Sequence, residues 1–188
     1  MVSATHGMGH EDKIRELAMS VMAQMRDNEE KLIRDAKKFI KQNRHAAKKV
    51  FTVDVDGWTP IHACAMRGSK KLLKTMLSAG IDVNIQMGQP EGLPRACTLL
   101  HVAANRSDSK ICEYLITNGA DINLTDSFDR TPLYYMAKND KKRLIKLVKD
   151  RGSDTSIIEK WLPEWNIDVS EDCVRRQRAM KLCFFFRF

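Results

Sequence analysis

The apolar residues in the middle of the chain fall into three groups that share one helical spacing. Each group places its side chains at i, i+1 and i+4, which buries one face of a short helix. The groups are Leu72, Leu73, Met76 and Leu77; then Ile111, Cys112, Leu115 and Ile116; then Leu144, Ile145 and Val148. Because a single short helix cannot cover its own apolar face, the three groups predict helices that stack on one another.

The N-terminal part of the chain carries a second apolar stripe. Residues 11–50 contain neither proline nor glycine, so no strong helix breaker interrupts them. The stripe consists of Ile14, Leu17, Ala18, Val21, Met22 and Met25, and it resumes at Leu32, Ile33, Ala36, Phe39 and Ile40. It predicts one long amphipathic helix or two helices in series. Residues 1–10 precede it and are expected to be disordered.

The three apolar groups belong to a longer unit that occurs three times. A threonine suited to an N-cap begins each unit, and a glycine suited to a left-handed helix end closes it. The first residues are Thr59-Pro60, Thr98-Leu99 and Thr131-Pro132, and the glycines are Gly80, Gly119 and Gly152. Thr98 and Thr131 are 33 residues apart, whereas Thr59 and Thr98 are 39 apart. A 33-residue unit therefore repeats, with six residues inserted once.

This period and its motifs resemble the ankyrin repeat. The motifs are Thr59-Pro60-Ile61-His62, Gly80-Ile81-Asp82-Val83-Asn84 and Gly119-Ala120-Asp121-Ile122-Asn123. The resemblance covers residues 56–154 and implies an all-α ankyrin repeat solenoid, made of helix-turn-helix units with short hairpin-like finger loops. The expected repeats are 56–84, 97–123 and 129–156, with an inserted finger loop at 85–97. Ser107 and Asp140 depart from the pattern, since each stands where the family has a glycine.

The resemblance also assigns structural roles to four polar residues. His62 and His101 are expected to bond a threonine of their own or a neighbouring repeat. Asn84 and Asn123 are expected to bond across the finger turn. In some ankyrin proteins the closing asparagine is hydroxylated, and Asn123 is the better candidate here.

Catalytic and metal-binding interpretations find little support. His62 and His101 are of a type that ligates metals and transfers protons, but no other residue stands at ligand spacing, and Tyr134 replaces the histidine in the third unit. Gly-rich phosphate loops, nucleophile arrangements and paired cleft carboxylates are also missing from the sequence. We therefore expect a non-catalytic protein with no cofactor and no bound metal.

The resemblance implies that a protein partner lies against the finger loops and the first helices of the repeats. The inserted loop holds two prolines and two glycines, which predicts an extended, turn-rich segment. Loops on rigid scaffolds often carry recognition residues, and tryptophan is a favoured hot spot. The predicted partner-binding residues are Trp58, Met87, Glu91, Arg95 and Phe128. In the alternative, the loop is a tolerated insertion and Trp58 packs on the N-terminal segment.

Composition narrows the setting. The 188 residues carry a net charge of +8, with 43% hydrophobic residues and no apolar run long enough to span a membrane. The first ten residues lack the features of a signal peptide, so we expect an intracellular protein, cytoplasmic or nuclear. The five cysteines form no C-x-x-C pair. Cys64 and Cys112 are expected in the core, and Cys97, in the inserted loop, is expected to be the most exposed thiol.

The positive charge gathers on the N-terminal segment and on the outer side of the second helices. The residues are Lys31, Arg34, Lys37, Lys38, Lys41, Arg44, Lys48 and Lys49, then Lys70, Lys71 and Lys74, then Lys141, Lys142, Arg143, Lys146 and Lys149. This charge favours acidic partners. The pattern lacks aromatic interleaving and a groove-reading helix, which disfavours nucleic acid, and we do not expect membrane binding.

Two interpretations of residues 11–50 remain open. The segment either caps the open face of the first repeat, which we favour, or binds an anionic membrane, nucleic acid or a calmodulin-like partner. Its methionine-rich stretch from Ile14 to Met25 is less clearly needed for a cap and could pair with a helix of another chain, although we expect a monomer.

The repeat pattern fails after Asp154. Residues 157–188 are expected to form an irregular C-terminal cap with a basic tail that ends in Phe184-Phe185-Phe186-Arg187-Phe188. This tail folds back, touches a membrane, or ends a truncated or alternatively spliced chain, and we favour the last. The sequence as a whole predicts an adaptor that binds a partner segment in its concave groove. The alternatives are a regulatory ankyrin fragment of a larger enzyme or channel, or a basic protein associated with membranes or nucleic acid.

Overall fold

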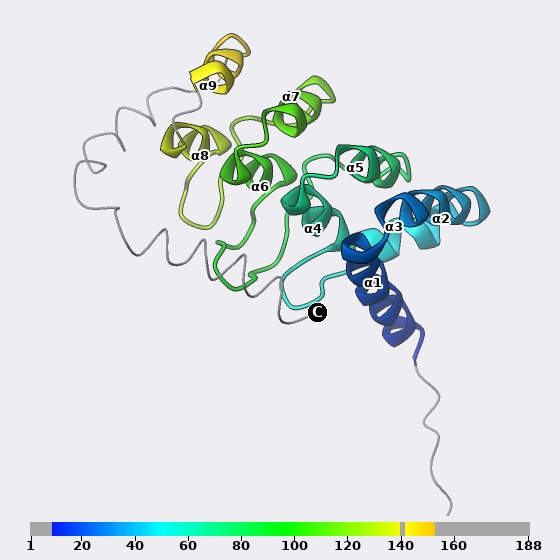
Figure 1. The fold of residues 1–188 in the computed structure, drawn as a ribbon. Coiled ribbons are helices and arrows are strands. Elements are labelled where there is room, and N and C mark those ends of the chain that lie inside the picture. Colours follow the sequence, from blue (N-terminus) through cyan, green and yellow to red (C-terminus); the bar gives the residue numbers. More distant parts are fainter. Residues whose placement is uncertain (1–8, 140–141, 153–188) are drawn as a thin grey trace, which may run out of the picture.

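The computed structural model describes residues 9–139 and 142–152, and these residues form helices joined by turns and loops (Figure 1). Within the described ranges no β-strand occurs, and only two isolated β-bridges pair loop residues. The all-α prediction is therefore confirmed. The helices are α1 (His10–Asp27), α2 (Glu29–Gln42), α3 (Arg44–Thr52), α4 (Pro60–Arg67), α5 (Lys70–Leu77), α6 (Leu99–Arg106), α7 (Ser109–Thr117), α8 (Pro132–Lys138) and α9 (Lys142–Lys149).

The helices are arranged in two layers (Figure 1). Within each repeat the first helix packs against the second, so α4 pairs with α5, α6 with α7 and α8 with α9. The first helices also pack on one another along the array, from α4 to α6 to α8. Each repeat thus covers the apolar face of the next, as the spacing of the apolar groups predicts.

The N-terminal segment forms three helices, so the prediction of one helix or two in series is wrong. The breaks fall at Asn28 and Asn43, and each asparagine side chain accepts a hydrogen bond from a backbone N–H of the following helix. Asn28 bonds Lys31 N and Asn43 bonds Ala46 N, both at 2.9 Å. Asparagine is a strong N-cap, so two such residues divide a segment that has no proline or glycine.

The three N-terminal helices pack on the first repeat. α1 packs on α4 and α2 on α5, so these two helices extend the two layers of the array, while α3 contacts α1, α2 and α4. In the interface, Phe51 is 1% exposed and meets Phe39 edge to face, with ring centroids 6.4 Å apart. This contact buries apolar surface that the first repeat would otherwise expose to water.

The methionine-rich stretch is also buried within the chain. Val21, Met22 and Met25 lie in the core, whereas Leu17 and Met19 on the same helix stay exposed. Pairing of the buried side chains with a helix of another chain is therefore corrected, because α1 already packs them against its own chain. α1 begins at His10, which corrects the expected disorder at residues 9 and 10. The predictions for residues 1–8, Asp140, Lys141 and 157–188 fall outside the described residues.

Candidate protein-binding surface

The first finger, residues 53–58, is a tight hairpin turn at the start of the first repeat. Val55 and Trp58 exchange backbone hydrogen bonds, with N···O distances of 2.7 and 3.0 Å. Between them, Asp56 and Gly57 have φ angles of 53° and 84°. Positive φ at both central residues is the geometry of a type I′ turn, for which Asp-Gly is a preferred sequence. The sequence of this finger therefore fixes its shape locally.

The second finger, residues 85–97, folds inward instead of projecting into solvent. The backbone of Met87 bonds Cys97 O at 3.0 Å and accepts from Ala96 N at 3.1 Å, which closes the loop near its base. Met87, Leu93 and Cys97 are 3%, 8% and 1% exposed. The prediction that Met87 contacts a partner is therefore corrected, because its side chain anchors the loop to the core.

The second finger also contacts both of its neighbours. A side chain at Gly57 would place its Cβ 2.3 Å from Pro90 N, so the inserted loop lies directly on the first finger. On the other side, Ser127 N donates to Arg95 O at 3.0 Å. The insertion thus fills the space between the first and third fingers, and the three fingers form one continuous surface.

The third finger, residues 124–130, is organised around the buried carboxylate of Asp126. Asp126 accepts hydrogen bonds from Phe128 N at 2.8 Å, from Arg130 N at 3.2 Å, from Arg130 Nε at 3.1 Å and from the Tyr135 hydroxyl. Burial and the bond to Asp126 raise the pKa of Tyr135 well above its usual value, so the phenol keeps its proton and donates it. Every one of these bonds fixes the finger or ties it to α8.

An aromatic and cationic cluster covers this carboxylate. The Arg130 guanidinium lies 4.7 Å from the ring centroid of Phe128, 5.2 Å from that of Tyr134 and 5.3 Å from that of Tyr135. Phe128 is nevertheless 61% exposed. A large aromatic side chain is therefore held toward solvent on a fixed backbone, which is the property of a protein-binding hot spot.

His62 and His101 tie the first helices to the fingers. His62 Nε2 lies 3.1 Å from Ile85 O and His101 Nε2 lies 3.0 Å from Arg130 O. Since a carbonyl can only accept, Nε2 of each ring carries the proton, and Nδ1 then accepts from the hydroxyl of Thr59 at 2.7 Å or of Thr98 at 2.8 Å. Both nitrogens of each ring are engaged, which leaves none for a metal ion.

Burial keeps these imidazoles neutral. It lowers the pKa of His62 to about 4 and also lowers the pKa of His101. Among the described residues no group of three or more histidine, cysteine or acidic side chains could hold a metal ion. The geometry of the two histidines is that of a structural bond between one repeat and the next finger.

Thr131 shows what the third repeat loses when tyrosine replaces histidine. Pro132 occupies the first position of α8, but the Thr131 side chain makes no capping bond. Its buried Oγ1 has no hydrogen-bond partner among the described residues. Tyr134 offers no ring nitrogen at the place where His62 and His101 accept from the threonine hydroxyl, so the bond is lost.

The closing motifs link the repeats on the side of the second helices. Asn84 Oδ1 accepts from Asp121 N of the next repeat at 2.8 Å. Asn123 lies in a matching turn, where its N–H donates to Asp121 Oδ1, and its side chain is exposed. Gly80, Gly119 and Gly152 have φ angles of 83°, 89° and 83°, in the left-handed region. Hydroxylation of Asn123 stays a prediction.

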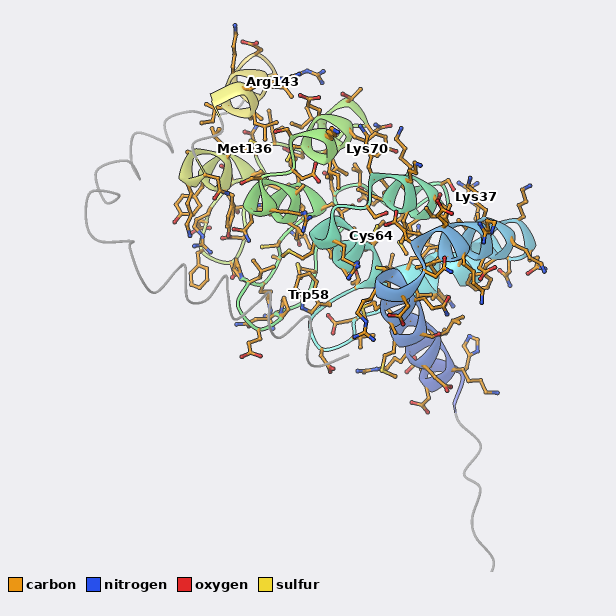
Figure 2. The ribbon with its side chains drawn as sticks, viewed as in Figure 1. Lys37, Trp58, Cys64, Lys70, Met136 and Arg143 are labelled. Carbon is orange, nitrogen blue, oxygen red and sulfur yellow. The ribbon has the colours of Figure 1, made fainter. Side chains whose placement is uncertain are left out.

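The predicted partner-binding residues divide between surface and core. Glu91, Arg95 and Phe128 are exposed, and Trp58 is half-buried and packs against the core beside the fingers (Figure 2). Sequence reasoning missed the cluster of Asp126, Arg130, Tyr134 and Tyr135. The signal available was the tyrosine pair in the third unit, at the position where the other two units have histidine.

The three described cysteines are all buried, so the expectation that Cys97 is an exposed thiol is wrong. We expect Cys64, Cys97 and Cys112 to resist iodoacetamide in the folded protein, since burial raises the pKa of Cys97 and of Cys112 to about 12 and raises that of Cys64 as well. Mass spectrometry of the labelled peptides, with and without urea, measures this protection. Equal labelling of Cys97 in both conditions contradicts the burial.

These features define a helical repeat protein whose finger loops form one face of a stacked array. Two family models match it: one described as "Ankyrin repeats (3 copies)" covers residues 91–163, and one described as "Ankyrin repeat" covers residues 56–87. Together they match more than half of the chain, which belongs to the ankyrin repeat proteins. A comparison with curated proteins found no match. Among the described residues, no helix is long and apolar enough to cross a membrane.

Proposed function

We propose that the chain is a non-catalytic adaptor that binds a segment of a protein partner along its finger surface. Ankyrin repeats are generally protein–protein interaction modules. The observation that carries the proposal is Phe128, which is 61% exposed on a finger whose backbone Asp126 holds in place. Because the aromatic side chain is already ordered, a partner that covers it loses little conformational entropy on binding.

The proposed binding surface runs along all three fingers. Its exposed members are Glu91, Arg95 and Phe128, and Trp58 supports it from the side of the first finger. Because the inserted loop contacts the first finger and bonds the third, a partner meets one surface and not separate loops. We also propose an intracellular setting, since the three described cysteines are free thiols and buried thiols persist most readily in a reducing compartment.

Phe128→Ala is expected to weaken partner capture about tenfold, because truncating an aromatic hot spot costs on the order of 1–2 kcal/mol of binding. The melting temperature should stay the same, since the side chain is mostly exposed. Affinity purification with quantitative mass spectrometry measures the capture of each protein. Leu17→Ala is the matched control, because Leu17 is also an exposed apolar side chain but lies on α1, away from the third finger.

Two outcomes decide the proposal. Loss of specific partners with Phe128→Ala but not with Leu17→Ala supports the finger surface as the binding site. Capture that is identical for both variants and for the unaltered chain places the partner elsewhere and refutes it.

A further inference from the structure

Charge is divided between two sides of the molecule. The loops that carry the fingers, 53–58, 82–97 and 121–130, hold seven acidic residues and two arginines. The acidic residues are Asp54, Asp56, Asp82, Glu91, Asp121, Asp126 and Asp129. The basic residues lie instead on the layer of α2, α5 and α9. Figure 2 shows this arrangement, with Lys37, Lys70 and Arg143 along one edge and Trp58 toward the opposite side. The net charge of +8 therefore does not describe the finger surface.

Two helices of the basic layer lie side by side and run in the same direction. At their starts, the Ser69 hydroxyl donates to the Glu29 carboxylate. At their ends, Arg44 Nε donates to Ala79 O at 3.0 Å. Between these two contacts the helices present seven basic side chains, which we call the outer basic ridge. They are Arg34, Lys37, Lys38 and Lys41 of α2 and Lys70, Lys71 and Lys74 of α5.

The ridge is not neutralised from within the described part of the chain. None of its seven side chains forms an ion pair with a described carboxylate, and Asp35 is the only acidic residue between Lys31 and Gln42. On α5, the ammonium groups of Lys70 and Lys74 lie 5.6 and 4.9 Å from the centroid of the same ring, that of Tyr114. Like charges one turn apart repel each other, so a bound anion would stabilise this pair.

The side chains around the ridge narrow the chemistry of its partner. Among the described residues, the exposed large apolar side chains are Leu17, Met19 and Phe128, none of which lies on α2 or α5. The apolar residues of α2 are turned inward, where Leu32 and Ala36 are buried. The ridge therefore offers no wedge for a bilayer and no aromatic side chain on which a base could stack. Lysines on flexible stems suit a chain of separate negative charges.

We propose that the outer basic ridge binds an extended acidic segment of a protein, rich in aspartate and glutamate. From Lys31 to Lys41 the helix is about 15 Å long, which matches about five residues of extended peptide. Alternate side chains of such a peptide point the same way, so carboxylates at every second position face the lysines. This site lies on the opposite side from the fingers and does not depend on the proposed finger partner.

The test uses the full chain and a dye-labelled peptide of alternating glutamate and serine, with binding followed by fluorescence anisotropy. Lys38→Glu with Lys71→Glu, one change on each helix, is expected to weaken binding about tenfold, through lost attraction and added repulsion. Lys13→Glu with Arg151→Glu changes the net charge by the same amount at exposed positions outside the ridge. This control pair should bind the peptide nearly as well as the unaltered chain. Lys38→Gln with Lys71→Gln gives a milder variant should charge reversal disturb folding.

Further arms separate the proposal from its competitors. A peptide of alternating glutamine and serine should not bind, and binding of the acidic peptide should fall with added salt. Phe128→Ala should leave peptide binding unchanged, which distinguishes this site from the finger surface. Equal loss in the ridge variant and the control pair overturns the proposal, because net charge alone then accounts for binding. Tighter binding to duplex DNA or to phosphatidylserine vesicles than to the peptide also overturns it.

Discussion

Asp126→Ala is expected to lower the free energy of unfolding by about 3–5 kcal/mol, because the change leaves a charged partner and several donors unpaired in a buried site. The carboxylate accepts four hydrogen bonds, two from backbone N–H groups and two from the Arg130 and Tyr135 side chains. Its removal strands the buried Tyr135 hydroxyl and removes the ion pair of Arg130, whose side chain is 21% exposed. Urea denaturation followed by circular dichroism measures the loss.

Asp129→Ala provides a control on the same finger. Asp129 is exposed, has a φ of 55° and makes no ion pair among the described residues. Alanine there is expected to cost on the order of 1 kcal/mol, from the left-handed backbone alone. Asp126→Asn should fall between the two, because the amide keeps one acceptor oxygen but loses the charge. A loss below about 1 kcal/mol for Asp126→Ala would show that the network is not a main support of the third finger.

The repeat scaffold was predictable because its signals are local. Helix spacing, the Thr-Pro steps and the closing glycines each act within a few residues. The same local rule also held the answer that was missed in the N-terminal segment. Asn28 and Asn43 are N-cap residues between apolar stripes, and weighing them would have divided the segment into three helices.

The inserted loop could not be predicted in the same way, because its shape depends on distant residues. Its two prolines and two glycines indicate turns but do not show which side chains turn inward. Met87 and Cys97 are buried because the loop rests on Gly57 and is bonded to Ser127, which lie 30 residues from either residue along the chain. The Asp126 cluster was missed for a similar reason, since its hydroxyl donor, Tyr135, comes from the next helix.

The two proposed surfaces follow from one division of labour within the repeat. Bonds from His62 and His101 fix the fingers to the preceding repeats, so finger side chains such as Phe128 are free to vary with the partner. The second helices are held by their inner apolar residues alone, and their outer positions accumulate lysine without disturbing the stack. A single chain can in this way present an acidic finger surface and a basic ridge.

Mild acid is expected to destabilise the protein through the same two histidines. The pKa of His62 is lowered from its usual 6.5 to about 4, and that of His101 is also lowered, so the unfolded state binds protons more readily than the folded state. The stability from neutral burial is present above pH 6.5 and is lost progressively as the pH falls toward 4. For His62 alone this amounts to about 2 kcal/mol at pH 5 relative to pH 7. Urea denaturation at a series of pH values between these limits measures the slope.

Removing histidines in matched pairs assigns that slope. His62→Gln with His101→Gln should lower stability at neutral pH, because the bonds to Ile85 O and Arg130 O are lost or weakened, but should flatten the dependence on pH between 5 and 7. His10→Gln with His45→Gln removes two exposed histidines and should keep the slope of the unaltered chain. Carboxylates titrate mostly below this window, so they contribute little to it. A slope that persists in the first pair and disappears in the second would place the acid sensitivity outside the finger bonds.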